Sequence, residues 1–241
     1  MQQQQYSDNP YEASNFESVA HAGSSERADF ILKTYLHLAA AVAAFVGIEF
    51  ALLSLPNIDE LVMSMIGGRW SWLIVLGAFM LVSHVANRWA QSSTSLGMQY
   101  AGLSLYVVAE AIIFVPLLYI ASAYGGDDVI PTAALITGIM FGGLTAVVFL
   151  TRKDFSFLRG ALMLGGFAAM GLIVCGICFG FELGNIFTVF MIVLASGYIL
   201  YSTSNIMLHY RVGQHVAASL ALFASVALLF WYILQLLMSR E

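Results

Sequence analysis

The run LYVVAEAIIFVPLLYI, residues 105–120, decides the fold of this chain. Its only ionisable acid is Glu110, and the apolar character continues on both sides to cover about residues 97–122. A helix of about 20 mainly apolar residues is long enough to cross the hydrocarbon core of a bilayer. The run therefore predicts a membrane-spanning helix that carries an acid near its middle.

The composition indicates that this span is one of several. The chain has 241 residues, of which 60% are hydrophobic and 10% charged, and its mean hydropathy is +0.85. Such values are typical of a polytopic membrane protein, and no basic footprint for nucleic acid is present. We predict an all-α fold with seven transmembrane helices, at about 33–53, 71–90, 97–122, 130–150, 158–180, 184–208 and 214–237.

The loops between these spans are short, so consecutive helices should be antiparallel neighbours in one transmembrane domain, residues 30–241. The polar residues 1–29 precede this domain, and their composition predicts a disordered cytoplasmic tail. Orientation follows from the basic residues, because cytoplasmic segments carry the excess of Lys and Arg. With the N-terminus inside, seven basic residues are cytoplasmic and two are external, so the C-terminus is expected outside.

Small residues suggest which helices pack closely. The fourth span contains Gly138 and Gly142, and the fifth contains Gly176 and Gly180, each pair in the spacing G-x-x-x-G. This spacing lets helix backbones approach each other in membranes. We expect the fourth and fifth spans to lie in the interior of the bundle.

Ionisable groups at membrane depth are costly and face the protein interior or a wet cavity. Glu110 is expected to be either a proton or cation site or a neutral acid bonded to a neighbouring helix. Glu49 lies about one turn from the outer end of the first span and is expected to reach the interface. His84, near the inner end of the second span, is expected to be either a titrating group or an amphipathic group at the interface.

A second feature is the stretch GYILYSTSNIMLHY, residues 197–210, which places polar side chains on a spanning helix. Tyr198, Ser202, Asn205 and His209 follow steps of four, three and four residues, which is one stripe of a helix. The stripe has two interpretations, hydrogen bonding between helices and the wall of a wet cavity. Ser225, at a similar depth on the seventh span, favours the cavity.

The loop LTRKDFSFLRG, residues 150–160, connects the fourth and fifth spans and combines Arg152, Lys153 and Arg159 with Asp154. Asp154 or Ser156 is expected to cap the following helix, and the basic side chains are expected to contact anionic lipids. Docking of a partner protein is the alternative role of this loop.

The loop 150–160 and the stretch 197–210 resemble the sequence motifs of the Bax inhibitor-1 family, most closely those of its bacterial YccA-like branch. That branch has T-T-R-K-D-x-S-F-L-x-G between the fourth and fifth helices and a run like I-L-[FY]-[DE]-T-[SQ]-x-I on the sixth helix. The resemblance covers about residues 30–237. It implies seven helices, with one central helix wrapped by the other six.

The resemblance also implies a function, because bacterial members behave as pH-sensitive calcium leak channels. In them two aspartates, on the sixth and seventh helices, share a proton, and a basic group on the second helix can latch to them. Here these acids align with Ser202 and Ser225, and His84 falls close to the basic position. Serine hydroxyls do not titrate in the useful range, so either Glu110 has taken over the ionisable role or pH-gated conduction is lost.

We therefore expect a multi-pass protein of the bacterial inner membrane that conducts calcium or another cation. The alternative is a non-conducting regulator that is a modulator or substrate of a membrane-bound ATP-dependent protease of the FtsH type, for which the N-terminal tail would be a handle. Protease and hydrolase motifs are missing, so no enzyme activity, cofactor or built metal site is expected. The candidate ion-path or pH-sensing residues are Glu110, Ser202, Ser225, His84, Asn205 and His209, and the cytoplasmic loop motif is Arg152, Lys153 and Asp154.

Overall fold

The computed structural model describes residues 18–68, 70–92 and 95–239, and this part of the chain is helical. Within these residues, Ser18 and Arg211 form an isolated antiparallel β-bridge. The helices are α2 (Ser24–Leu53), α3 (Ile58–Ile66), α4 (Ser71–Ala90), α5 (Leu96–Tyr124), α6 (Val129–Thr151), α7 (Leu158–Phe179), α8 (Gly184–Leu208) and α9 (His215–Met238).

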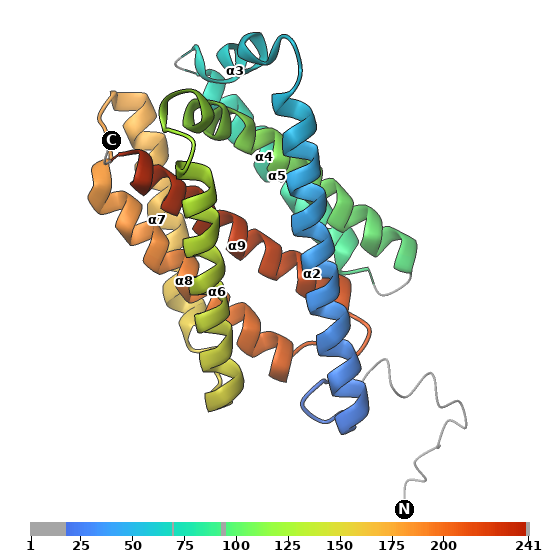
Figure 1. Ribbon diagram of the computed structural model, residues 1–241. Helices are drawn as coiled ribbons and strands as arrows, with labels where there is room; N and C mark the ends of the chain where they lie inside the picture. The colour runs from blue at the N-terminus through green and yellow to red at the C-terminus, as the bar shows by residue number, and fades with distance from the viewer. Residues whose placement is uncertain (1–17, 69, 93–94, 240–241) are drawn as a thin grey trace, which may run out of the picture.

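All of these helices except α3 are long and apolar enough to cross a membrane, which gives seven candidate spans as predicted. The short α3 lies across one end of the bundle (Figure 1). The expected and observed helix ends differ by at most two residues, apart from the start of α2. That helix begins at Ser24, nine residues before the expected start at residue 33.

The earlier start of α2 has a local cause in the segment 18–23. Arg27 donates hydrogen bonds from Nε to the carbonyl of Val19, at 3.0 Å, and from Nη2 to that of Ala20, at 2.5 Å. The backbone N–H of Val19 donates to the carbonyl of Tyr210 at 2.9 Å, and the Val19 side chain is fully buried. The expected tail of residues 1–29 thus differs from the structure over 18–29, while residues 1–17 lie outside the described residues.

Helix α9 is the central element of the bundle. It packs against α2, α4, α5, α6 and α8, and Figure 1 shows it crossing behind α2 and α6. Leu222, Leu229 and Leu234 on this helix are fully buried. The hydroxyl of Ser219 donates to the carbonyl of Thr34 at 2.8 Å and so joins α9 to α2. The expected central helix is therefore present, although α7 packs mainly on α8 at the periphery.

The closest backbone approach is between α4 and α5. A Cβ atom on Gly102 would lie 2.5 Å from both the carbonyl oxygen of Ala86 and the backbone nitrogen of Ala90. Both atoms belong to backbone and cannot rotate away, so this position requires glycine. The backbones of α4 and α5 are consequently in direct contact at this point.

The expectation that the fourth and fifth spans lie in the interior is wrong for both, because few residues of α6 and α7 are buried. A Cβ atom on Gly138 or Gly142 of α6 would meet nothing within 4 Å, so these glycines are not packing positions within this chain. Helices α6 and α7 are peripheral, and the well-buried helices are α5, α8 and α9. In a helix that is apolar all round, small residues do not reveal which side faces protein and which faces lipid.

The two ends of the bundle differ in charge because consecutive helices alternate in direction. We call one end the basic end; it carries Arg27, Lys33, Arg88, Arg152, Lys153, Arg159 and Arg211. The opposite end is called the acidic end; it carries Asp59, Glu60, Asp127, Asp128 and Glu182.

Candidate functional site

A cavity of about 990 Å³ lies between α4, α5, α7, α8 and α9. Most of its wall is apolar, with aromatic side chains such as Trp72, Phe79 and Trp231. The wall also includes Glu110, Ser202 and Ser225, so three of the residues predicted from the sequence share one cavity. This placement favours the cavity interpretation of Ser202 over simple hydrogen bonding between helices.

Glu110 stands at the midpoint of α5 and is 6% exposed. Its Oε2 atom is buried and has no hydrogen-bond partner within the described chain. The polar side chain that interacts with this carboxyl is Tyr106, one turn earlier on the same helix. A buried carboxyl that is not fully hydrogen-bonded is costly unless it is neutral or close to a cation or water. The geometry thus provides an acid that can exchange a proton or a cation with the cavity.

The two serines are neutral groups in the same wall. Ser202 on α8 is 7% exposed and Ser225 on α9 is 6% exposed. The Ser225 hydroxyl donates to the carbonyl of Ala221 at 2.8 Å, and its oxygen remains available as an acceptor. The pair keeps polarity at this depth but supplies no second charge beside Glu110.

The cavity extends from this depth to the acidic end. Its wall there contains the turn between α7 and α8, with Glu182, and the last polar residues of α9, Gln235 and Ser239. Gly180 and Gly184 flank the turn in left-handed conformations, with φ of 74° and 64°. Sequence reasoning counted Glu182 only as part of an acidic loop; the flanking glycines indicate a turn with left-handed positions but not the direction in which it folds.

Toward the basic end the cavity is closed by packed side chains. On α8 the fully buried Ile206 follows Ser202, and on α9 the buried Leu220 precedes Ala221, which lines the cavity. The site is therefore a pocket that ends about two helical turns from the basic end of α8 and α9, with the Glu182 carboxyl at its mouth and the Glu110 carboxyl in its wall at mid-bundle.

The structure separates His84, Asn205 and His209 from this cavity. His84 is exposed on α4 and does not line the cavity wall, so it is not positioned as a latch for Ser202 or Ser225. The carbonyl of Asn205 accepts hydrogen bonds from the backbone N–H groups of His209 and Tyr210, at 2.8 and 3.0 Å. Asn205 and His209 thus form the end of α8, and the polar stripe reaches the cavity only through Tyr198 and Ser202.

The side chains of Ser202, Thr203 and Ser204 face three different parts of the protein. Ser202 faces the cavity, whereas the buried hydroxyl of Thr203 interacts with Tyr35 of α2. Ser204 is fully buried and faces the loop between α6 and α7. There its Oγ accepts a hydrogen bond from the backbone N–H of Phe155 at 2.9 Å. Consecutive helical positions point about 100° apart, so such a division is a direct consequence of the helix.

The loop with Arg152, Lys153 and Asp154 is joined to the end of α8. Asp154 Oδ1 accepts from the backbone N–H of Ser156 at 2.8 Å, and Oδ2 lies 3.6 Å from Nε2 of His209. The backbone N–H of Ser156 is the main cause that holds the pKa of Asp154 below its ordinary value; burial is the next effect and opposes it, and His209 and Ser204 add smaller effects in the direction of Ser156. Asp154 caps this turn rather than α7 itself, which begins at Leu158 without a side-chain cap.

A further carboxyl was misplaced by sequence reasoning. Glu49 of α2 is 4% exposed, and neither of its oxygens has a hydrogen-bond partner within the described chain, so it does not reach the interface. The buried residues of α2 recur at steps of three or four residues and include Leu38, Ala41 and Phe45. Glu49 continues this series, which is the pattern that placed it inside.

The fold and the site define a class: a multi-pass helical membrane protein with an acid in the wall of an internal cavity. A family model described as inhibitor of apoptosis-promoting Bax1 matches residues 27–241. The chain belongs to the Bax inhibitor-1 family.

Known relatives agree with this assignment. The chain is 30% identical over 164 residues to the uncharacterized protein PA2604 of Pseudomonas aeruginosa, covering 66% of this chain and 69% of the relative. It is 27% identical over 203 residues to the modulator of FtsH protease YccA of Escherichia coli K12, covering 84% and 85%. The same identity and coverage hold for the inner membrane protein YccA of Escherichia coli O6:H1.

Proposed function

We propose that this protein is an inner-membrane cation leak, with calcium as the first candidate ion, in which Glu110 is the group that binds the ion or a proton in transit. The observation that carries the proposal is the buried carboxyl of Glu110 in the wall of a cavity that begins at Glu182. Acidic groups at a mouth concentrate cations, and a buried carboxyl stabilises them where the surroundings are apolar. The basic end is taken to be cytoplasmic, because positive residues are enriched on that side.

The replacement of both sensor acids by serine sets the form of the pH response. Two close carboxylates titrate as a coupled pair, whereas a single carboxyl titrates in one step. Ser202 and Ser225 supply oxygen ligands but no proton in the useful range. We therefore expect the pH dependence of ion flux to reside in Glu110 alone.

Weak coordination also favours a leak over a storage site. Calcium takes six to eight oxygen ligands, including carboxylates. In the half of the cavity that contains Glu110, the polar wall consists of one carboxyl and hydroxyls such as those of Ser202 and Ser225. An ion held in this way is released easily once the packed layer with Ile206 and Leu220 opens.

The test is calcium flux into liposomes that contain a calcium-sensitive dye, measured between pH 6 and 8. Wild type should give flux that changes with pH, and Glu110→Gln should make the flux independent of pH. His84→Ala is the matched control, since His84 lies outside the cavity, and it should leave both rate and pH profile unchanged. Equal flux in protein-free and protein-containing liposomes would reject the proposal.

A second candidate function follows from the relative whose name is modulator of FtsH protease YccA, which matches 84% of this chain. In this role the protein is a modulator or substrate of a membrane-bound ATP-dependent protease, and the N-terminal residues are the handle. Because the segment 18–23 is bonded to Arg27 of α2 and to Tyr210 after α8, the clean test is deletion of residues 1–17. The deletion should change protein lifetime in cells that contain the protease; an unchanged lifetime would remove this argument.

A further inference from the structure

Aromatic side chains flank the carboxyl of Glu110 on both sides within the cavity. Tyr106 and Phe114 lie one helical turn before and after Glu110 on α5, so the three side chains share one face of that helix. All three line the cavity, and so does Phe79 of α4. The ring of Phe79 meets that of Tyr106 edge to face, with 6.0 Å between the ring centroids.

The aromatic surface continues from Phe114 to α9 and back to α4. The ring of Trp231 on α9 meets that of Phe114 edge to face, with 4.9 Å between the centroids and 86° between the planes. Trp72 of α4 stacks on Trp231, with the centroids 6.1 Å apart. The cavity-lining residues Phe79, Tyr106, Phe114, Trp231 and Trp72 are called the aromatic wall. Three helices supply its members, so the packing of the bundle builds it around Glu110.

The cavity is open beside α4 as well as at the acidic end. Helix α4 packs on α3, α5 and α9, whereas α7 packs on α8, so α4 and α7 border the cavity without forming a packed helix pair. Met80 of α4 lines the cavity and is nevertheless 46% exposed. Molecules dissolved in the bilayer therefore reach the cavity along this border. A volume of about 990 Å³ is enough for an organic molecule of drug-like size.

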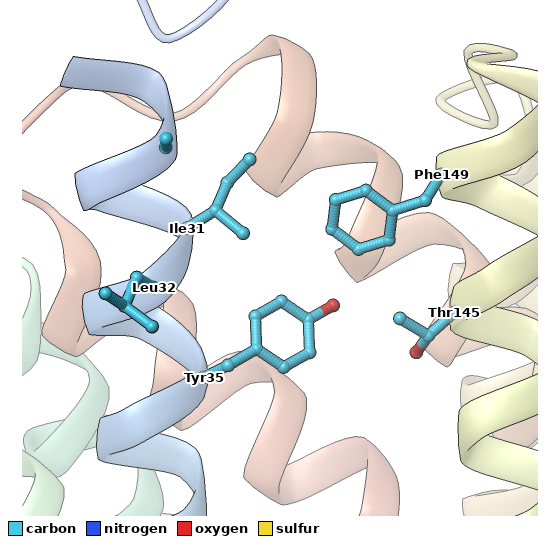
Figure 2. A pocket seen from close by; sticks show the side chains of 6 residues that line it. Ile31, Leu32, Tyr35, Thr145 and Phe149 are labelled. Carbon is cyan, nitrogen blue, oxygen red and sulfur yellow. The ribbon is translucent and has the colours of Figure 1, made fainter. Parts of the chain in front are cut away.

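The hollow between α2 and α6 shows what the Glu110 cavity adds. It has a volume of about 490 Å³ and an apolar lining that includes Ile31 and Phe149, with no charged side chain. Figure 2 shows the hydroxyl end of Tyr35 pointing toward the side of Thr145, with which it interacts. That hollow offers no charge to a ligand, whereas the Glu110 cavity combines a carboxyl with the aromatic wall.

The carboxyl and the aromatic wall favour different parts of one ligand. Oε2 of Glu110 is buried and has no hydrogen-bond partner within the described chain, so a positive charge beside it is stabilised. The faces of aromatic rings also attract cations, and their area favours apolar groups. A neutral apolar molecule would leave the carboxyl unpaired, and a small inorganic ion would leave most of the aromatic wall without contact. A cation on an apolar body satisfies both.

We propose that the Glu110 cavity binds lipophilic organic cations, such as quaternary ammonium or phosphonium ions with aryl groups. The cationic centre lies beside the Glu110 carboxyl, and the apolar groups pack on the aromatic wall. The inference rests on the proposed function, because both use Glu110 as the group that binds a cation. An organic cation bound there occludes the path of an inorganic ion.

The test uses the purified full chain in dodecyl maltoside micelles at pH 8, with tetraphenylphosphonium as the probe. Equilibrium dialysis measures binding in excess of that to protein-free micelles. Wild type should bind about one probe per chain. Glu110→Gln should lower the affinity roughly thirtyfold or more, because the buried cation loses its partner. Glu49→Gln is the matched control, since Glu49 is equally buried but does not line the cavity, and it should bind as wild type does.

A second measurement tests the charge on the wild-type protein alone. Tetraphenylborate has the shape of the probe and the opposite charge, so it should not bind in the cavity. Trp72→Leu should weaken binding of tetraphenylphosphonium roughly tenfold. Trp89→Leu should leave it unchanged, because Trp89 is an exposed residue of α4 outside the cavity.

Two results would overturn the proposal: equal binding of tetraphenylborate and tetraphenylphosphonium by wild type, and equal binding of tetraphenylphosphonium by the Glu110 and Glu49 variants. The assay contains no ion flux, so it separates this inference from the proposed function. Saturable binding that depends on Glu110 supports the inference even where liposomes show no calcium flux. Calcium flux that depends on Glu110, together with no binding of the probe, rejects the inference and leaves the proposed function in place.

Discussion

Replacement of Ser204 by alanine tests how the loop between α6 and α7 is attached to the bundle. Ser204 is fully buried, and its Oγ accepts the backbone N–H of Phe155 at 2.9 Å. The same oxygen lies 3.4 Å from the carbonyl of Lys153 and 3.5 Å from Asp154 Oδ1. Alanine removes this acceptor and donor without adding volume, so the substitution isolates the hydrogen bonds.

The expected change in the free energy of unfolding depends on the polar groups that lose their hydrogen-bond partner. A neutral hydrogen bond contributes about 0.5–1.5 kcal/mol net, and a buried polar group left without a partner costs about 1–3 kcal/mol. Phe155 is partly buried, so water satisfies its N–H only in part after the change. We expect Ser204→Ala to lower the free energy of unfolding by about 1–2 kcal/mol and to loosen the loop.

The assay is equilibrium unfolding by sodium dodecyl sulfate in bicelles, combined with limited proteolysis at the loop after Thr151. Ser202→Ala is the matched control, because that hydroxyl faces the cavity and has no part in holding the loop. Ser204→Ala should be less stable than Ser202→Ala and should be cut faster in the loop. If the two variants unfold and are cut alike, the attachment inferred for Ser204 is wrong.

Two further predictions concern helix packing and pH. Gly102→Ala should destabilise the protein by about 1–3 kcal/mol, because the added Cβ overlaps backbone atoms of α4. Gly138→Ala should stabilise it by up to about 1 kcal/mol, because a Cβ there meets nothing and alanine favours the helix. Equilibrium unfolding in bicelles measures both changes. Because the pKa of folded Asp154 lies below its ordinary 3.8, its contribution to stability is present above that pH and is lost as pH falls through the folded value. Asp154→Asn should therefore remove part of the loss of stability seen below pH 4 in an unfolding series, and an unchanged pH profile would contradict this reasoning.

The spans could be predicted from the sequence because the membrane imposes a length and a composition on each helix. The resemblance implied a central helix without identifying it, and the structure shows that it is α9, whereas the peripheral position of α6 did not follow from any pattern. Its glycines, Gly138 and Gly142, have the spacing of a packing motif but face open space. Within lipid, apolar side chains suit the protein side and the lipid side equally, so periodicity carries little information there.

Prediction of the site succeeded where helical spacing and depth were enough. Glu110, Ser202 and Ser225 share a cavity because each faces the space between α5, α8 and α9. His84 was expected near them from its sequence position, but the rotation of α4 about its axis leaves it exposed. Glu182 was missed because a turn can fold over a cavity or away from it, and only the backbone conformation decides between the two.

The central claim is that an aqueous cavity connects the acidic end with Glu110, and cysteine accessibility tests it most directly. In a background with Cys175 and Cys178 replaced by alanine, Ser225→Cys should react with a charged, membrane-impermeant methanethiosulfonate added on the side of the acidic end. Ile206→Cys, within the closed layer, should stay unmodified. The account predicts fast modification of the first variant from that side only; equal, slow reaction of both variants would contradict it.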